Sequence, residues 1–401
     1  MKNFYFLILI YSQFTFSQEW THFTPSDNLI NGAISSIEKF NDDYYVGTWV
    51  FLSSETTYGL GKFDGTNWVK ISDPNLHNEV SSLLNDNNGN LWIGTHNGLT
   101  KFDGNQFIKF TTSNGLPSNF INSVKKDADG KIWIATNNGV VTYENNIFTT
   151  IPQLIGKPVY TLEFVDTGIV WFSVHNEGIY VKNLNSWSIL STSNGLSSNS
   201  PFVLKKGADS DVWIGHYIGF SSNSLDRYNL SNLSMTNYYL ANGLPDFYVR
   251  AIEKDLNGNI YIGTNNGLSR FNGTTFETLN YNGPLESNII RSLFLMGSEL
   301  WIGTFAGVSK NSTFLNLDDF KKVNEISIYP NPSNNLISIY KLSNNTDNFL
   351  YKIIDISGRT LLNGSSKFME QISIESLIKG NYILQIEVIN GEKWTQKLIK
   401  H

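Results

Sequence analysis

The chain has 401 residues and a mass of 45.3 kDa, enough for two or three domains that each bury a core. Its aromatic content of 14% against 16% charged residues excludes a disordered chain and a coiled coil, and the 32 glycines favour short strands joined by tight turns. A net charge of -6 argues against a nucleic-acid partner. The lack of cysteine excludes disulfides, thiol nucleophiles and cysteine–zinc sites.

The first element is an N-terminal export signal. Residues 1–17 carry one positive charge at Lys2, an apolar run from Phe4 to Tyr11, and small or polar residues up to Ser17. This pattern resembles a secretory signal peptide with cleavage before Gln18. A membrane anchor is the alternative, but the apolar run is too short to span a bilayer, and no second stretch approaches that length.

A four-residue phrase, typically Trp-Ile-Gly-Thr, recurs between the two ends of the chain. Its seven copies lie at Tyr45–Thr48, Trp92–Thr95, Trp133–Thr136, Trp171–Val174, Trp213–His216, Tyr261–Thr264 and Trp301–Thr304. They are 38 to 48 residues apart, which is the length of a propeller blade. The sequence therefore predicts an all-β fold with a seven-bladed β-propeller over residues 18–320.

Each repeat divides into four strands, here named a to d. The third repeat shows them at Phe120–Lys125, Lys131–Thr136, Val140–Tyr143 and Ile147–Thr150. Asn-Gly and Asp-x-x-Gly turns separate them and supply the positive φ angles of tight hairpins. The segment Trp20–Phe23 matches a d strand, whereas the last repeat has only a weak one around Phe314. We expect Trp20–Phe23 to complete the seventh blade and close the ring.

The segments that feed these repeats carry a second signature, found at Ser113–Asn119, Ser193–Asn199 and Asn242–Pro245. With the Trp-Ile-Gly-Thr phrase, it resembles the two-component-regulator propeller repeat over residues 20 to about 318. The resemblance implies a fold used by periplasmic sensors of hybrid histidine kinases, which often sense polysaccharide fragments. Because the sequence contains no transmembrane helix, kinase or DNA-binding segment, we do not expect it to signal in cis.

One face of the predicted propeller carries the candidate ligand site. The d–a connections and the b–c hairpins share this face, and two b–c hairpins are longer than the others, at Trp49–Tyr58 and Tyr217–Ser224. Trp49 has no role in the repeat and stands near Phe51. Aromatic side chains on such loops stack on sugar rings or fill peptide grooves, so Trp49, Phe51 and Tyr217 are candidate ligand-binding residues. Alternatively, Trp49 folds down over its own hairpin.

Three histidines are expected on the same face. His96 and His175 follow a b strand, and His216 replaces the final threonine of the phrase. We expect them to be polar residues at the rim of a central pocket. Since they belong to separate blades and no carboxylate accompanies them at a regular spacing, a shared metal is not expected.

No catalytic or cofactor motif is found. Three Asp-x-x-Gly turns resemble the start of a calcium loop but lack the glutamate at its twelfth position, so we interpret them as hairpin turns. They are Asp86–Gly89, Asp127–Gly130 and Asp255–Gly258, with Asn97, Asn138 and Asn266 at the twelfth positions. A Walker loop and a Gly-x-Ser-x-Gly elbow are also lacking in the sequence. We therefore expect no cofactor, no metal and no enzymatic activity.

The repeat pattern stops near residue 325. After a linker at residues 321–325, residues 326–401 alternate apolar and polar positions as in a small Ig-like β-sandwich. The strands are expected at Leu336–Tyr340, Leu350–Ile356, Ile372–Ile374, Asn381–Val388 and Lys393–Ile399.

Four short blocks in this domain carry a further resemblance. They are Tyr329–Pro332, Asp355–Arg359, Gly380–Tyr382 and Lys397–Lys400. They resemble the C-terminal sorting domain of the type IX secretion system of Bacteroidetes. The resemblance implies that residues 326–401 engage that machinery, and that the protein is secreted or held on the outer-membrane surface of a Gram-negative bacterium. A generic Ig-like adhesion module is the alternative.

These observations favour an exported binding protein that holds a glycan or protein ligand on the b–c face without catalysis. One alternative is a propeller lyase or hydrolase resembling the streptogramin lyases, whose chemistry uses histidine and a divalent metal. Another is a structural or adhesive surface protein in which the propeller is only a rigid spacer.

Overall fold

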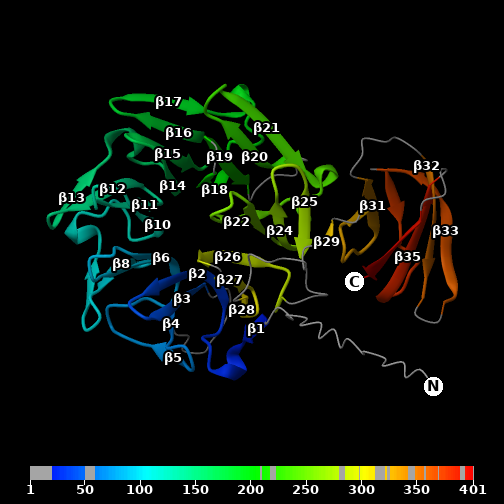
Figure 1. Ribbon diagram of the computed structural model, residues 1–401, viewed down its shortest axis with the longest axis horizontal. Coiled ribbons are helices and arrows are strands. Elements are labelled where there is room, and N and C mark those ends of the chain that lie inside the picture. The colour runs from blue at the N-terminus through cyan, green and yellow to red at the C-terminus, as the bar shows by residue number, and fades with distance from the viewer. Residues whose placement is uncertain are drawn as a thin grey trace, which may run out of the picture.

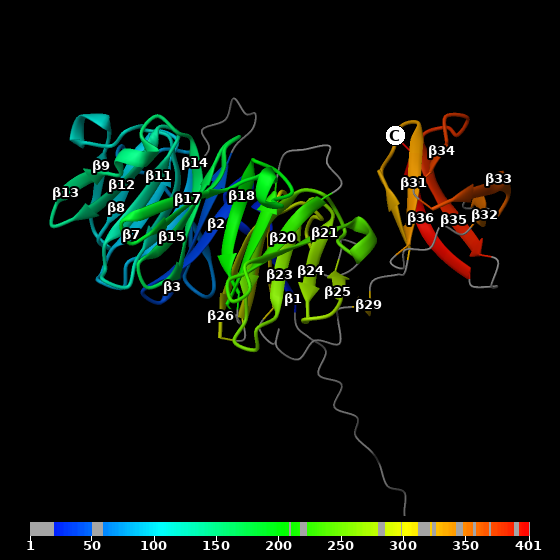
Figure 2. The ribbon, with the colours of Figure 1, turned by 90° about the horizontal axis from the view of Figure 1, so that it is seen from above.

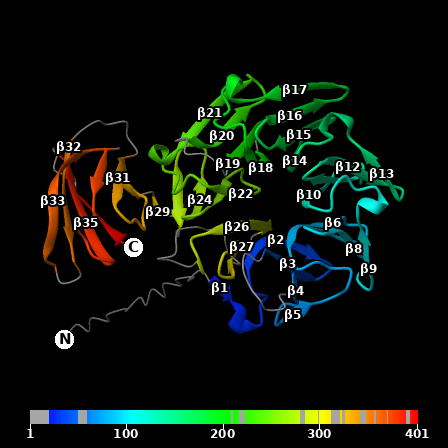
Figure 3. The same cartoon turned by 180° about the vertical axis from the view of Figure 1, so that it is seen from behind.

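The computed structural model describes residues 20–49, 59–207, 210–216, 223–279, 285–297, 299–311, 321–322, 326–341, 348–355, 358–368, 370–388 and 393–400. Over these residues the chain forms a ring of seven antiparallel sheets, followed by two further sheets at its C-terminal end (Figure 1). The view from behind shows the same ring of sheets (Figure 3). The predicted signal peptide, residues 1–17, lies outside the described residues.

The two inner strands of each blade surround the centre of the ring. The innermost a strands are β2 (Ala33–Phe40), β6 (Val80–Asn85), β10 (Ile121–Lys126), β14 (Val159–Asp166), β18 (Pro201–Lys206), β22 (Val249–Lys254) and β26 (Ile290–Met296). The b strands are β3 (Asp43–Trp49), β7 (Leu91–Thr95), β11 (Ile132–Thr136), β15 (Ile169–Val174), β19 (Asp211–His216), β23 (Ile260–Thr264) and β27 (Glu299–Thr304). Each b strand contains one copy of the recurring phrase.

The two outer strands complete each blade. The c strands are β4 (Leu60–Phe63), β8 (Gly98–Phe102), β12 (Gly139–Glu144), β16 (Gly178–Asn183), β20 (Asn223–Asn229), β24 (Gly267–Phe271) and β28 (Val308–Asn311). The d strands of blades 1 to 6 are β5 (Trp68–Ile71), β9 (Phe107–Phe110), β13 (Ile147–Thr150), β17 (Ser186–Leu190), β21 (Ser234–Tyr239) and β25 (Phe276–Leu279). The seven-bladed, all-β prediction is confirmed.

The seventh blade is closed by the start of the chain. Strand β1 (Trp20–Phe23) pairs antiparallel with β28, with Trp20 opposite Asn311 and Phe23 opposite Val308. The ring is therefore sealed by hydrogen bonds between segments almost 300 residues apart. This confirms the predicted role of Trp20–Phe23. The predicted weak d strand around Phe314 lies outside the described residues.

The first residue of the recurring phrase anchors the turn between the a and b strands. Trp92 Nε1 donates a hydrogen bond to Asp86 Oδ2 at 3.0 Å, and Trp133 Nε1 donates to Asp127 Oδ2 at 2.8 Å. The other oxygen of Asp86 accepts the backbone N–H groups of Asn88 and Asn90. The aspartate thus fixes the turn and the indole together, which confirms that these are hairpin turns. Hydrogen bonds to a charged group contribute about 1.5–3 kcal/mol each.

The last two residues of the phrase hold neighbouring elements together. A Cβ placed on Gly94 would lie only 2.8 Å from Cγ2 of Ile121, so the glycine allows the a strand of the next blade to pack closely. Thr95 Oγ1 donates to Gly98 O at 2.7 Å and accepts the N–H of Asn97, which closes the b–c hairpin. The same close approach is seen at Gly263 and the same hairpin cap at Thr136, Thr264 and Thr304, so the phrase recurs where blades share these two contacts.

Most connections from a d strand to the next a strand contain one short 3-10 turn. These turns are η1 (Pro25–Asp27), η2 (Thr112–Asn114), η3 (Pro152–Leu154), η4 (Thr192–Asn194) and η5 (Leu240–Asn242). After η2, Gly115 adopts φ 111°, and the chain reverses so that Leu116 is buried between blades. The predicted Ser-Asn-Gly-Leu signature is therefore a capped turn.

The C-terminal domain is a two-sheet sandwich. Its sheets are β30-β31-β34 and β33-β32-β35-β36, which enclose a core that includes Ile337, Phe349 and Leu384. The strands are β30 (Ile326–Tyr329), β31 (Leu336–Lys341), β32 (Asn348–Ile354), β33 (Thr360–Lys367), β34 (Gln371–Ser373), β35 (Gly380–Val388) and β36 (Lys393–Lys400). Strand β33 was not predicted, because its Asn-Gly-Ser-Ser sequence is typical of a turn.

The segment between the domains is partly paired with the propeller. Strand β29 (Lys321–Lys322) falls within the predicted linker, residues 321–325, and adds to the outer edge of β25 in blade 6. Strand β25 offers unpaired backbone groups along that edge, and β29 satisfies them. Seen from above, the sandwich stands beside the propeller disc next to β25 and β29 (Figure 2).

Candidate functional site: the central cavity

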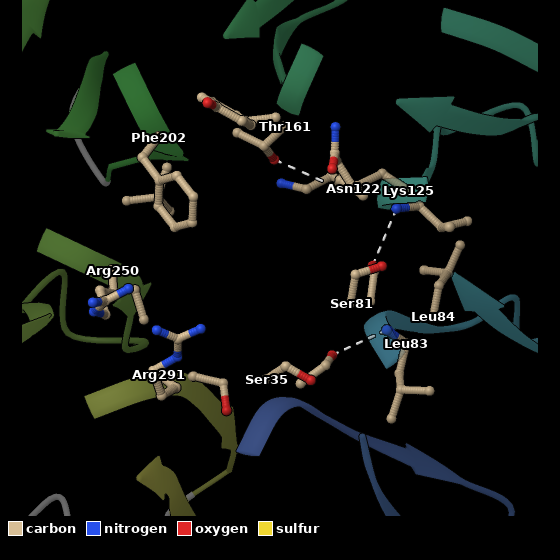
Figure 4. A pocket seen from close by; sticks show the side chains of 18 of the residues that line it. Ser35, Ser81, Leu83, Leu84, Asn122, Lys125, Thr161, Phe202, Arg250 and Arg291 are labelled. Atoms are coloured by element: carbon tan, nitrogen blue, oxygen red, sulfur yellow. Dashed lines mark hydrogen bonds between the residues drawn. The ribbon is translucent and has the colours of Figure 1, made fainter. Parts of the chain in front are cut away.

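The a strands enclose a cavity of about 880 Å³ at the centre of the ring. This volume lies within the range of small-molecule binding sites. All seven a strands contribute side chains to its wall, together with residues of several b–c hairpins and d–a connections (Figure 4). The mouth lies where the a strands begin, because the b–c hairpins reach the cavity at that end.

A β-bulge in every a strand shapes the mouth. In each a–b pair the strand register shifts across one residue near the start of the a strand. In β2 the shift lies between Ile34 and Ser36, and in β26 it lies between Ile290 and Ser292. A bulge inserts one unpaired residue and re-aims its side chain. The residues at this position form what we call the mouth ring. They are Ser35, Ser81, Asn122, Tyr160, Phe202, Arg250 and Arg291, and all of them line the cavity.

The mouth ring differs in chemistry from one side to the other. On blades 1 to 3 its side chains are small and polar, and they bond to the next blade: Ser81 Oγ donates to Ile121 O at 2.6 Å, and Asn122 Nδ2 donates to Val159 O at 2.8 Å. On blades 4 and 5 the members of the mouth ring are the aromatic residues Tyr160 and Phe202, whose ring centroids lie 5.5 Å apart. On blades 6 and 7 the mouth ring is cationic. Arg250 and Arg291 line the cavity from neighbouring blades (Figure 4).

Three of the predicted site residues line the same mouth. Trp49, His96 and His175 each follow the last residue of the recurring phrase, at the start of a b–c hairpin. Trp49 contacts His96 edge to face at 5.3 Å, so it does not cover only its own hairpin. His96 also stacks on Phe120 at 3.7 Å. Trp49 therefore occupies the same position in its repeat as His96 and His175 do in theirs, contrary to the prediction that it has no role in the repeat.

The two cavity histidines are held in the wall by neighbouring residues. Burial lowers the pKa of His96 below its usual value, although Glu79 Oε2 lies 3.2 Å from Nδ1 and opposes this shift. The imidazole of His96 is therefore neutral near pH 7. His175 Nδ1 is 2.9 Å from the hydroxyl of Tyr160, and its Nε2 is 3.1 Å from Asn176 Nδ2. These contacts fix the walls of the mouth.

His216 does not lie on the rim of the cavity as expected. It is buried inside blade 5, where Nε2 lies 2.8 Å from Asp226 Oδ2. The reason is its position in the phrase: the last residue points into the hairpin, as Thr95 does, whereas the following residue lines the cavity in blades 1 to 4. That following residue in blade 5 is Tyr217. The candidates Phe51 and Tyr217 lie outside the described residues.

Sequence reasoning missed Tyr160, Phe202, Arg250 and Arg291. A usable signal was present, because near the start of each a strand an apolar residue or proline is followed by a variable residue, a residue that is usually small, and an apolar residue. The variable residue is the member of the mouth ring. Its position could be read from the repeats, but its direction depends on the bulge, which no propensity reveals.

A second ring lies three residues farther along each a strand, and we call it the deep ring. Its members are Glu38, Leu84, Lys125, Glu163, Lys205, Glu253 and Phe294. In a regular strand, residues three apart point to opposite faces, and the bulge removes this constraint. Lys125 pairs with Glu163, and Lys205 Nζ lies 2.5 Å from Glu253 Oε1.

Two carboxyl groups of the deep ring have pKa values shifted in opposite directions. Burial opposes ionisation of Glu163, but Lys125 and Lys205 outweigh it and hold its pKa below the usual value. Burial raises the pKa of Glu38 to about 7, and the charge of Glu253 adds to the rise. Glu38 is therefore the titrating carboxyl of the cavity near neutral pH.

The comparisons with known proteins agree with this architecture. The family model for the secretion system C-terminal sorting domain matches residues 327–401, and that for the two component regulator propeller matches residues 76–97 and 115–138. No curated protein matches the chain. None of the helices in the described part of the chain has the length and apolarity of a membrane span.

Solved structures share the fold at low sequence identity. The extracellular domain of BT3049 from B. thetaiotaomicron matches with a TM-score of 0.64 and 17% identity over 96% of this chain and 57% of its own. PorZ of Porphyromonas gingivalis, an essential surface component of the type IX secretion system, matches with a TM-score of 0.55 and 15% identity over 92% and 59%. YCF48 matches with a TM-score of 0.53 and 10% identity over 73% and 96%.

The chain thus spans less than two thirds of the BT3049 domain and of PorZ. The sorting domain implies handling by the type IX secretion machinery and points to a secreted or cell-surface location. Residues 327–401 thus match the secretion system C-terminal sorting domain, and residues 76–97 and 115–138 match the two component regulator propeller, in a chain that folds as a seven-bladed β-propeller followed by a β-sandwich.

Proposed function

We propose that this protein is an exported binding protein that holds a glycan or protein ligand in the mouth of its central cavity, without catalytic activity of its own. The observation that carries the proposal is the convergence of the mouth ring and the hairpin residues on one 880 Å³ cavity. Delivery by the type IX secretion system through residues 326–401 would place this cavity outside the cell.

The aromatic part of the mouth favours a sugar or peptide ligand. Trp49, Tyr160 and Phe202 all line the cavity, and their flat faces offer apolar contact area with few rotatable bonds. Polar groups from Asn122 and Asn137 stand at the same level, with Asn122 Nδ2 2.9 Å from Asn137 Oδ1. Aromatic faces beside amide groups are suited to the apolar ring faces and hydroxyl edges of a saccharide. A propeller of the same fold, YCF48, has been solved bound to D1 peptide, which supports the protein alternative.

The roles of the cavity histidines support the non-catalytic part of the proposal. His96 stacks on Phe120 and contacts Trp49 edge to face, and His175 is bonded through both ring nitrogens. Among the residues that the structure describes, no group of three or more histidine, aspartate or glutamate side chains is gathered for metal binding. These contacts favour a role for His96 and His175 in the cavity wall.

The test is a binding screen of the purified full chain against neutral and acidic oligosaccharides and peptides, read by thermal shift and titration calorimetry. A ligand at one hundred times its Kd should add about 2.7 kcal/mol to the free energy of unfolding. Trp49→Ala should weaken the binding of a hit at least tenfold, because it removes the largest aromatic face at the mouth.

The matched control is Phe305→Ala. Phe305 occupies the equivalent hairpin position in blade 7 and is 49% exposed, but it does not line the cavity. The Phe305→Ala variant should therefore bind the same ligand with unchanged affinity. Equal losses for both variants, or turnover of the bound ligand by the wild-type protein, would show that the proposed site or its binding role is wrong.

A further inference from the structure

One side of the cavity mouth is uncharged and follows a single pattern. Ser35, Ser81 and Asn122 are the mouth-ring residues of blades 1, 2 and 3, and they stand on the cavity wall (Figure 4). All three residues are partly exposed, so a ligand in the mouth can reach them. We call these three residues the polar arc.

Each residue of the polar arc donates to the backbone carbonyl oxygen that begins the next a strand. The pairs are Ser35 with Val80, Ser81 with Ile121, and Asn122 with Val159. A carbonyl oxygen accepts but cannot donate, so the direction of these hydrogen bonds is fixed. The Asn122 amide also donates to Asn137 Oδ1, at 2.9 Å. The serine hydroxyl oxygens and Asn122 Oδ1 therefore offer a ligand acceptors only.

A second row of hydroxyl groups lies one residue farther along the a strands and has the opposite polarity. Ser36 Oγ accepts the backbone N–H of Leu83 at 3.0 Å, and Ser82 Oγ accepts that of Val124 at 3.1 Å. Both serines line the cavity. Neither hydroxyl donates to another of the described residues, so its hydrogen is left for a ligand. The wall of blades 1 and 2 thus offers acceptors in one row and donors in the next.

This double row matches the hydroxyl groups of a neutral sugar. A sugar hydroxyl both donates and accepts, so one group can donate to the polar arc and accept from Ser36 or Ser82. A peptide backbone divides these roles between separate N–H and C=O groups. None of the five side chains is charged, so the rows offer a ligand charge no counter-ion. Trp49 lines the same cavity from blade 1 and suits the apolar face of a sugar ring.

We propose that the polar arc, together with Ser36 and Ser82, is a subsite for a neutral oligosaccharide whose adjacent hydroxyl groups donate to Ser35, Ser81 and Asn122. This proposal rests on the binding function proposed above and names its ligand class. The hydroxyl hydrogens of the sugar are essential to it, because the polar arc has acceptors for them and no donors of its own to replace them.

The test compares neutral tetrasaccharides with their per-O-methyl ethers by titration calorimetry on the full chain. The probes are cellotetraose, maltotetraose and mannotetraose. Methylation removes the hydroxyl hydrogens and keeps the oxygens, so the tetrasaccharide that binds should exceed its ether in affinity by about tenfold or more. Its affinity should also be insensitive to salt, because no charge pairing is involved.

Variants separate the loss of hydrogen bonds from the added bulk of the methyl groups. Ser35→Ala and Ser81→Ala should each lower the affinity for the tetrasaccharide about fivefold, since each removes one acceptor. Any measurable binding of the ether should respond to neither variant, because the bond is already lacking. The matched control is Ser173→Ala. Ser173 also donates to a carbonyl of the next blade, at Pro201, but it does not line the cavity, so the affinity should be unchanged.

Four outcomes would overturn the inference, and they are distinguishable. A tetrasaccharide that binds no better than its ether, with no effect of either serine variant, would remove the subsite and leave the proposed function standing. Equal losses of affinity for Ser81→Ala and Ser173→Ala would show that these serines only join blades. Binding of acidic oligosaccharides or peptides alone would replace the ligand class. Lack of binding by the wild-type protein to every saccharide and peptide would reject the proposed function itself.

Discussion

The two rings of the central cavity are made from the same seven strands, three residues apart, yet they differ in what their side chains do. In the mouth ring, neighbouring residues share a chemical type, so that polar, aromatic and cationic arcs follow one another around the opening. In the deep ring, Lys125, Glu163, Lys205 and Glu253 alternate in sign and pair along the wall. The mouth ring groups side chains of one chemical type, whereas the deep ring pairs opposite charges.

This difference separates recognition from stability within one repeat. Aromatic and polar side chains gathered at the mouth of a cavity are typical of ligand-binding sites. Alternating charges that are half-buried stabilise the wall through mutual attraction. Changes in the deep ring should therefore alter the free energy of unfolding, and changes in the mouth ring should alter ligand affinity.

The largest expected effect is at the centre of the deep ring. Glu163→Gln removes the carboxylate that lies between Lys125 and Lys205, which leaves both lysines without its attraction. Because these lysines retain some contact with water, at 29% and 26% exposure, we expect the free energy of unfolding to fall by about 2 kcal/mol, somewhat less than for a fully buried pair. Urea unfolding followed by tryptophan fluorescence measures this change.

An exposed ion pair supplies the control for Glu163. Glu144, which is 51% exposed and 3.4 Å from Lys131, lies in the c strand of blade 3. Glu144→Gln should lower the free energy of unfolding by less than about 0.5 kcal/mol. If the two variants have equal effects, the deep ring does not stabilise the propeller more than a surface pair does.

The fold was predictable because its causes repeat along the chain. The tryptophan, glycine and threonine of the phrase each satisfy a local requirement, namely a turn, a close approach and a hairpin cap, and these requirements recur in nearly every blade. The closing strand was predictable because Trp20–Phe23 resembles a d strand. Strand β33 was missed because it is an edge strand with turn-like residues, and pairing with β32 overrides its local preference.

The site was only partly predictable. Trp49, His96 and His175 were found because they stand next to the phrase, whereas His216 was misplaced by one position. The arginines and aromatics of the mouth ring depend on a bulge that shifts the register by one residue in every a strand. Which face a side chain then takes follows from backbone pairing, and residue type does not encode it.

A second prediction concerns the pH dependence of stability. Because burial raises the pKa of Glu38 from 4.5 to about 7, the folded state binds a proton that the unfolded state releases, and Glu38 costs stability as the pH rises through this range. The free energy of unfolding of Glu38→Gln should therefore rise relative to that of the wild-type protein between pH 5 and pH 8. The increase should reach on the order of 1–2 kcal/mol at pH 8. Urea unfolding at pH 5, 6, 7 and 8 measures the difference, and a difference that stays constant over the series would contradict this account of Glu38.

The smallest expected effect on stability belongs to the two arginines of the mouth ring. Arg250→Gln loses the bond to Asn265 and Arg291→Gln loses the contact with Trp49, but each also relieves the repulsion between two neighbouring cations. These terms oppose one another at partly exposed side chains, so the free energy of unfolding should change by less than about 0.5 kcal/mol in either variant. The same urea titrations measure it. A loss of 2 kcal/mol or more would show that the arginines hold the blades together, and the division between a recognising mouth and a stabilising deep ring would then fail.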